Sequence, residues 1–68
     1  MKVMNAKEIG KKLAALRGDK TQSKVANDIG ISVSALAMYE NGERIPRDNI
    51  KIRLAEYYSK PISVIFFD

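Results

Sequence analysis

Apolar side chains recur every three or four residues along most of this chain, and single glycine or proline residues interrupt the pattern at short intervals. A period near 3.6 is typical of amphipathic helices, and no segment alternates for long enough to indicate a strand. Because glycine and proline readily end helices, the pattern predicts several short helices instead of one long helix. We therefore expect an all-α fold and a single domain over residues 1–68.

Capping residues predict where these helices begin. Asn5, Thr21 and Ser32 carry side chains that favour helix N-termini. Asp48 is the expected cap of a later helix, and Pro61 suits the first position of the last one. The expected helices cover residues 6–17, 22–29, 33–41, 49–59 and 61–66.

The apolar positions of these segments predict the core. In the fourth segment the buried stripe is expected to contain Ile50, Leu54 and Ala55, widened by Ile52 and Tyr57. The other expected core residues are Ile9, Leu13, Leu16, Val25, Ala26, Ile29, Leu36, Tyr39, Tyr58, Ile62, Ile65 and Phe66.

The residue types that the chain lacks exclude several functions. It contains no cysteine and no histidine, so disulfides, thiolate or imidazole metal sites and the commonest general base are excluded. A chain of 68 residues also has little room to enclose an active site. We expect no enzymatic activity, no cofactor, no metal and no small-molecule substrate. No apolar run is long enough for a signal peptide or a membrane span, so we expect no membrane partner and a cytoplasmic location.

The distribution of charge is uneven. The formal net charge is +4, but residues 25–43 contain Asp28, Glu40 and Glu43 and no lysine or arginine. Basic residues therefore lie in two zones on either side of an acidic middle zone. This layout is compatible with an anionic partner, and equally with scattered solvated side chains.

The segment Gly30-Ile31-Ser32 joins two short expected helices. Glycine readily adopts left-handed backbone angles, Ile31 can pack under the turn, and Ser32 can cap the next helix. Ala26 is small, which permits a close approach of the two helices. This is the arrangement of a helix-turn-helix, although its spacing alone also fits an ordinary helical hairpin.

A longer series of motifs favours the helix-turn-helix over the ordinary helical hairpin. They are Thr21-Gln22-Ser23-Lys24-Val25-Ala26, Ile29-Gly30-Ile31-Ser32, Ser34-Ala35-Leu36, Tyr39-Glu40-Asn41-Gly42 and Arg44-Ile45-Pro46. In order and spacing this series resembles the Xre family of phage repressor and Cro-like DNA-binding domains, over about residues 6–67. The resemblance implies a compact five-helix, lambda-repressor-like domain that contains a helix-turn-helix. It also implies a sequence-specific transcriptional regulator, a repressor of bacterial or prophage genes, which binds double-stranded operator DNA and so locates to the nucleoid.

The resemblance also implies roles for individual residues. The residues expected to face DNA bases are Val33, Ser34, Ala37 and Met38. The residues expected to contact DNA phosphates are Gln22, Ser23, Lys24, Ser32, Asn41, Arg44 and Arg47. Glu40 is expected to pair with a base of the first helix, either Lys11, Lys12 or Arg17. The alternative is that Val33 and Met38 pack at the edge of the core and that the arginines are solvated loop charges.

Two features depart from the family pattern. The link at residues 18–20 looks short, which predicts a shortened or rotated first helix. The expected base-facing surface has no Arg, Lys, Asn or Gln before Asn41, so the bidentate readers of guanine and adenine are missing. We therefore expect modest direct readout of bases and a larger share from phosphate contacts and DNA shape.

One reading helix contacts few bases, so we expect a homodimer on a palindromic operator whose half-sites lie roughly 34 Å apart. The apolar C-terminal tail exceeds what one buried helix face needs, and Tyr57, Val64 and Phe67 are the expected dimer contacts. The alternative is that the tail closes the core of the monomer. A different function also remains open: a protein-interaction module, such as an antitoxin, that binds a partner protein through the fourth and fifth helices.

Overall fold

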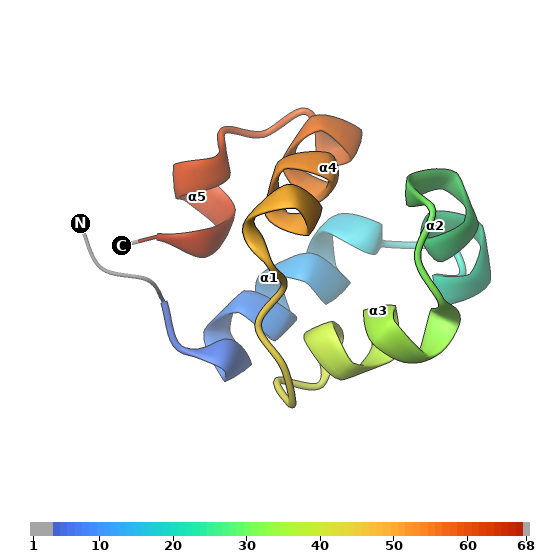
Figure 1. The fold of residues 1–68 in the computed structure, drawn as a ribbon, viewed down its shortest axis with the longest axis horizontal. Helices are drawn as coiled ribbons and strands as arrows, with labels where there is room; N and C mark the ends of the chain where they lie inside the picture. Colours follow the sequence, from blue (N-terminus) through green and yellow to red (C-terminus); the bar gives the residue numbers. More distant parts are fainter. Residues whose placement is uncertain (1–3, 68) are drawn as a thin grey trace.

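Five short helices account for most of residues 4–67, the part of the chain that our computed structural model describes. They are α1 (Ala6–Arg17), α2 (Gln22–Ile29), α3 (Val33–Glu40), α4 (Asp48–Tyr58) and α5 (Ile62–Phe66). In Figure 1, α2 lies at one end of the molecule and α5 at the other, with α1 and α4 between them. The expected all-α, five-helix fold is confirmed. None of the helices within these residues has the length and hydropathy needed to cross a bilayer.

The first three helices begin where their capping side chains predict. The side chains of Asn5, Thr21 and Ser32 each accept a hydrogen bond from the backbone N–H three residues further on, at 2.9, 3.1 and 3.0 Å. α1 extends to Arg17, and Gly18 ends it with a positive φ of 56°. α1 therefore has the predicted bounds, and the short link does not shorten it.

The start of α4 differs from the prediction. The helix begins at Asp48, so Arg47 occupies the N-cap position and its side chain makes no capping hydrogen bond. Asp48 is helical, and its Oδ1 lies 3.7 Å from the Nζ of Lys51 one turn further on. The carboxylate therefore interacts with a lysine of its own helix and does not act as the predicted cap.

Three other boundaries move by one residue. α3 ends at Glu40, with Asn41 as its C-cap, and α4 ends at Tyr58. α4 stops there because Ser59 adopts a left-handed conformation with φ of 55°. Pro61 has an extended ψ of 141°, so it lies before α5 as the N-cap instead of in its first position.

The core contains the apolar residues predicted for it, with an exception on α4. Ile52 is 50% exposed, whereas its neighbour Lys51 is 7% exposed. The Nζ of Lys51 lies 5.3 Å from the ring centroid of Phe67 and 5.9 Å from that of Phe66. A lysine stem covers apolar surface, and its ammonium group is attracted to aromatic faces. Lys51 therefore occupies the inward position that the pattern gave to Ile52.

α1 and α3 touch through their backbones at Gly10. A Cβ atom on this buried glycine would lie 2.8 Å from the carbonyl oxygen of Tyr39, and closer still to that of Glu40. Glycine within a helix costs about 1 kcal/mol relative to alanine. Here that cost is accepted because no larger residue fits the crossing.

Tyr58 carries a polar group that the core leaves unsatisfied. Its hydroxyl is buried and has no hydrogen-bond partner within residues 4–67. Burial, together with the nearby negative charge of Glu40, raises the pKa of Tyr58 from 10.0 to about 12. The phenol therefore remains protonated and contributes mainly through its ring.

We expect Gly10→Ala to destabilise the protein by about 3 kcal/mol, because the added methyl group would force apart two backbones. Chemical denaturation followed by circular dichroism measures this change. Lys11→Ala is the control, since Lys11 is exposed on the same helix and the substitution should change stability by less than about 0.5 kcal/mol. Equal stabilities for the two variants would contradict the close crossing.

We expect Tyr58→Phe to leave stability unchanged or increased at neutral pH, because it removes a buried hydroxyl without a partner. The pKa of Tyr58 is raised in the folded protein, so the wild type loses stability as pH rises from about 10 to about 12. Tyr58→Phe has no phenol to ionise, so its free energy of unfolding should decrease less than that of the wild type over this pH range. Denaturation curves across that pH range test the prediction, and a destabilised variant at pH 7 would refute it.

Candidate functional site

The turn between α2 and α3 has the predicted geometry. Gly30 has φ of 78° and ψ of 35°, the left-handed region in which glycine pays no steric cost. The N–H of Ile31 then donates to the carbonyl oxygen of Ala26 at 3.0 Å, which closes the end of α2. Ile31 packs against the core and Ala26 is fully buried, so the two helices approach closely. α2 and α3 therefore form a helix-turn-helix.

The outward face of α3 collects the four side chains that were expected to face bases. Val33 and Ser34 are exposed, and Ala37 and Met38 are half-buried one turn further along. Leu36, by contrast, is fully buried. The face is uncharged and offers three apolar side chains of different size beside a hydroxyl group, so it suits contact with methyl groups and with neutral hydrogen-bonding edges.

The N-termini of α2 and α3 both lie open to an anion. Thr21 satisfies the N–H of Lys24, which leaves the N–H groups of Gln22 and Ser23 without an acceptor inside the helix. Neither α2 nor α3 has an acidic residue in its first turn, whereas α1 and α4 each have one. At Ser32 the hydroxyl oxygen accepts the capping bond, so its proton remains available to an outside acceptor. The positive ends of both helix dipoles are therefore unneutralised.

A buried carboxylate joins the first three helices. The side chain of Glu40 is 4% exposed, and it accepts hydrogen bonds from Arg17 Nε at 2.8 Å and Arg17 Nη2 at 3.0 Å. Gln22 Nε2 donates to the same carboxylate at 2.9 Å. Hydrogen bonding to Glu40 raises the pKa of Arg17 above its usual value. Of the three bases considered as partners of Glu40, Arg17 is the one that pairs with it.

This bond also orients Gln22. One N–H of its amide is used by Glu40, which leaves the other N–H and the oxygen Oε1 available for another partner. Gln22 is half-buried, so it presents these groups from a fixed position at the start of α2. Ser23, next to it, is exposed.

Lys24 is paired within α2. Its Nζ lies 3.2 Å from Asp28 Oδ1, and Asp28 Oδ2 accepts a 2.7 Å hydrogen bond from the hydroxyl of Tyr57 on α4. The hydrogen bond from Tyr57 lowers the pKa of Asp28 most, and the contact with Lys24 lowers it further. The hydrogen bond to Asp28 also raises the pKa of Tyr57. The Nζ of Lys20 lies 4.9 Å from the centre of the Tyr57 ring. Asp28 of α2 and Lys20 of the preceding link therefore both contact Tyr57 of α4, and Lys24 is joined to Tyr57 only through Asp28.

The loop after α3 folds back on the end of that helix. The N–H groups of Glu43 and Arg44 both donate to the carbonyl oxygen of Met38, at 2.9 and 3.4 Å. Asn41, Arg44 and Arg47 are exposed, while Pro46 is buried and anchors the loop. Neither arginine forms an ion pair within the described residues. The loop therefore holds two unneutralised guanidinium groups beside the end of α3.

The three residues expected at a dimer contact lie in different surroundings. Tyr57 is held to Asp28, and Phe67 is half-buried against Lys51. Val64 is 51% exposed and lines a hollow between α1 and α5. The structure therefore leaves Val64 as the most accessible of the three.

Sequence reasoning missed several contacts at this site. The pairing of Lys24 with Asp28 has the i, i+4 spacing that a sequence shows, but the hydrogen bond from Tyr57 joins helices far apart in the chain. Arg53 Nη1 likewise donates to the carbonyl oxygen of Ile29 at 3.3 Å, near the end of α2. Among residues 4–67 no cluster of carboxylates is placed to hold a metal ion.

Comparison with known proteins agrees with this geometry. A family model described as helix-turn-helix matches residues 11–65. The solution structure of the SOS-response transcriptional repressor LexA from Eubacterium rectale is similar with a TM-score of 0.87 and 26% sequence identity, over 94% of this chain and 70% of that one. No curated protein matches the sequence. The family match spans most of the chain and includes the observed turn, so the predicted relationship to Xre-type domains is confirmed and the chain belongs to the helix-turn-helix family.

Proposed function

We propose that this chain is a sequence-specific DNA-binding transcriptional regulator, a repressor of bacterial or prophage genes that binds a palindromic operator as a homodimer. The observation that carries the proposal is the uncharged outward face of α3 between two groups of unneutralised positive charge: the helix N-termini and the loop arginines. The similar structure from Eubacterium rectale is named a transcriptional repressor, which supports the same role. Residues 1–68 act as one DNA-binding domain in this proposal.

In this arrangement α3 enters the major groove. Its small apolar side chains contact thymine methyl groups, and its hydroxyl groups bond to base edges. The proposed base-facing residues are Val33, Ser34, Ala37 and Met38. Because none of them can form a bidentate contact, each base pair contributes modestly to specificity.

Phosphate contacts supply most of the affinity. The proposed contacts on either side of α3 are Gln22, Ser23, Lys24, Ser32, Asn41, Arg44 and Arg47. Gln22 acts from the position that Glu40 fixes, and Lys24 must share its charge between Asp28 and a phosphate. Binding that neutralises several phosphates releases counterions, so affinity should fall steeply with salt.

The rival function is a module that binds a partner protein through α4 and α5. A gel-shift assay with random-sequence duplex DNA at low salt separates the two. Retardation that disappears at moderate salt supports the proposal, because non-specific phosphate binding is electrostatic. No retardation at low salt overturns it.

We expect Arg44→Ala and Arg47→Ala each to weaken binding to all DNA sequences by a similar factor, because both residues are assigned to phosphates. Each should also reduce the slope of log K against log salt by about 1. Titrations of a single half-site duplex over a range of salt concentrations measure both effects. Lys12→Gln is the charge-matched control, since Lys12 Nζ bonds to the carbonyl oxygen of Val64 on the α5 side. A double arginine variant with unchanged affinity and slope would show that the loop does not contact DNA.

We expect Val33→Ala and Met38→Ala to change sequence preference with little effect on non-specific binding. The expected change is about 1 kcal/mol for each affected base pair. Selection of bound sequences from a random duplex pool, followed by titration of single base-pair changes in a half-site, measures it. Lys11→Ala is the control, because Lys11 is exposed on α1 and is not among the residues assigned to DNA. Identical preferences for all three variants and the wild type would remove α3 as the reading element.

A further inference from the structure

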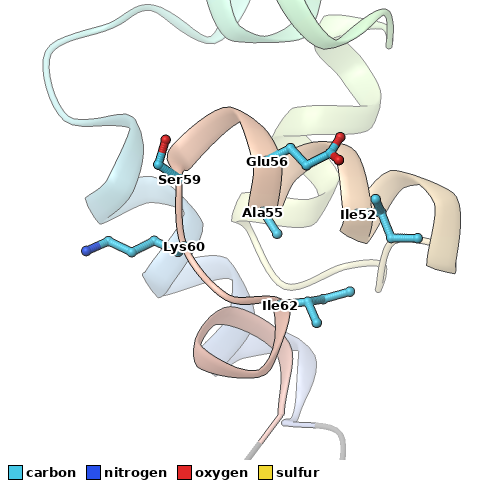
Figure 2. A pocket seen from close by; sticks show the side chains of 6 residues that line it. All are labelled: Ile52, Ala55, Glu56, Ser59, Lys60 and Ile62. Carbon is cyan, nitrogen blue, oxygen red and sulfur yellow. The ribbon is translucent and has the colours of Figure 1, made fainter.

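An open hollow of about 360 Å³ lies between α4 and α5, apart from the residues assigned to DNA. Figure 2 shows the six residues that line it, Ile52, Ala55, Glu56, Ser59, Lys60 and Ile62. Ala55 is nearly buried between exposed Ile52 and half-buried Ile62. The centre of the hollow is therefore apolar, and half of Ile52 is left exposed by residues 4–67.

The two charged residues of this hollow have opposite charges and lie at opposite ends of it. Glu56 and Lys60 point away from each other on either side of Ala55 (Figure 2). Within the described residues neither forms an ion pair. The surface thus has an acid at one end, a base at the other and apolar side chains between them.

Such a pattern is complementary to itself. In a dimer with two-fold symmetry both subunits use the same surface, and a two-fold axis perpendicular to the line from Glu56 to Lys60 places each end against the opposite end of the other copy. We propose that a second copy of this chain packs on this hollow, with Glu56 against Lys60 of the partner subunit and the reverse pair on the other side. Ile52 of each copy then lies in the apolar centre of the partner's hollow. The inference rests on the proposed function, since it names the contact surface of the proposed homodimer.

The hollow is small, and this sets the strength of the dimer. Stable interfaces bury roughly 800 Å² on each partner, whereas this contact uses one helix face and the start of another. The free protein should therefore associate weakly. Two adjacent half-sites hold two copies at a high local concentration, so the same contact appears as cooperative binding to DNA. Val64 lies on the neighbouring hollow, which shares Lys60, and so falls at the edge of this surface.

Reversal of the two charges tests the reciprocal pairing. Glu56→Lys and Lys60→Glu should each weaken self-association about tenfold, because each variant places like charges opposite one another. An equimolar mixture of the two variants should regain association, since every contact in the mixed dimer then joins opposite charges. Sedimentation equilibrium from high micromolar to millimolar concentration measures this. A bond within one chain cannot explain recovery that requires mixing.

A second pair of variants tests whether the apolar centre of the hollow contributes to self-association. Ile52→Ser should abolish measurable self-association, whereas Val33→Ser, at a similarly exposed apolar residue of α3, should not. Circular dichroism spectra confirm that all variants remain folded, since both positions are exposed.

The outcomes separate the two proposals. A mixture that associates no better than either variant alone, or a wild type that stays monomeric at millimolar concentration and fills two half-sites without cooperativity, overturns the dimer surface. Binding to a half-site would then still support the proposed function. A chain that dimerises with the expected charge dependence but does not bind DNA at low salt overturns the proposed function and supports the surface.

Discussion

The buried carboxylate of Glu40 is the interaction on which the helix-turn-helix depends. A carboxylate out of contact with water is costly unless its charge and its lone pairs are satisfied. Arg17 supplies two hydrogen bonds from α1, and Gln22 supplies one from α2. The close crossing at Gly10 brings the end of α3 against α1, where this pairing becomes possible. Loss of Arg17 would leave a buried charge uncompensated, and loss of Gln22 would remove one hydrogen bond to it, so three helices are held in one arrangement.

This arrangement divides the molecule into a scaffold and a proposed DNA-reading surface. The scaffold uses its polar groups internally: Arg53 bonds to the end of α2, and Tyr57 fixes Asp28. The proposed reading surface keeps its donors free at two helix N-termini and on the loop that contains Arg44. Because the two sets of groups do not compete, the free protein already presents its donors in place. Lys24 is the exception, since its pair with Asp28 must be shared or opened for a phosphate contact.

Local signals in the sequence predicted most of the fold. The caps at Asn5, Thr21 and Ser32 act within four residues, so they could be read directly and are confirmed. Two of the signals that failed depend on distant parts of the chain. Lys51 is buried because two rings of the C-terminal segment receive its ammonium group, and no local pattern reveals that. Spacing likewise could not choose Arg17 among three bases, since the choice depends on how α1 crosses α3.

The lack of charge on α3 has a consequence for how the regulator would achieve specificity. A face without arginine, lysine or amide side chains gains little free energy from any one base pair, so a single copy would discriminate poorly between sequences. Two copies on one operator add their contributions, and the sum becomes selective only if the copies are coupled. A strong dimer would bind non-specific DNA through twice the positive charge at all times. A weak, reciprocal contact at Glu56 and Lys60 avoids this, because it forms mainly where two half-sites are already adjacent. The weak base discrimination expected of α3 therefore requires coupling between two copies, and a weak contact at the α4–α5 hollow would supply that coupling on the operator.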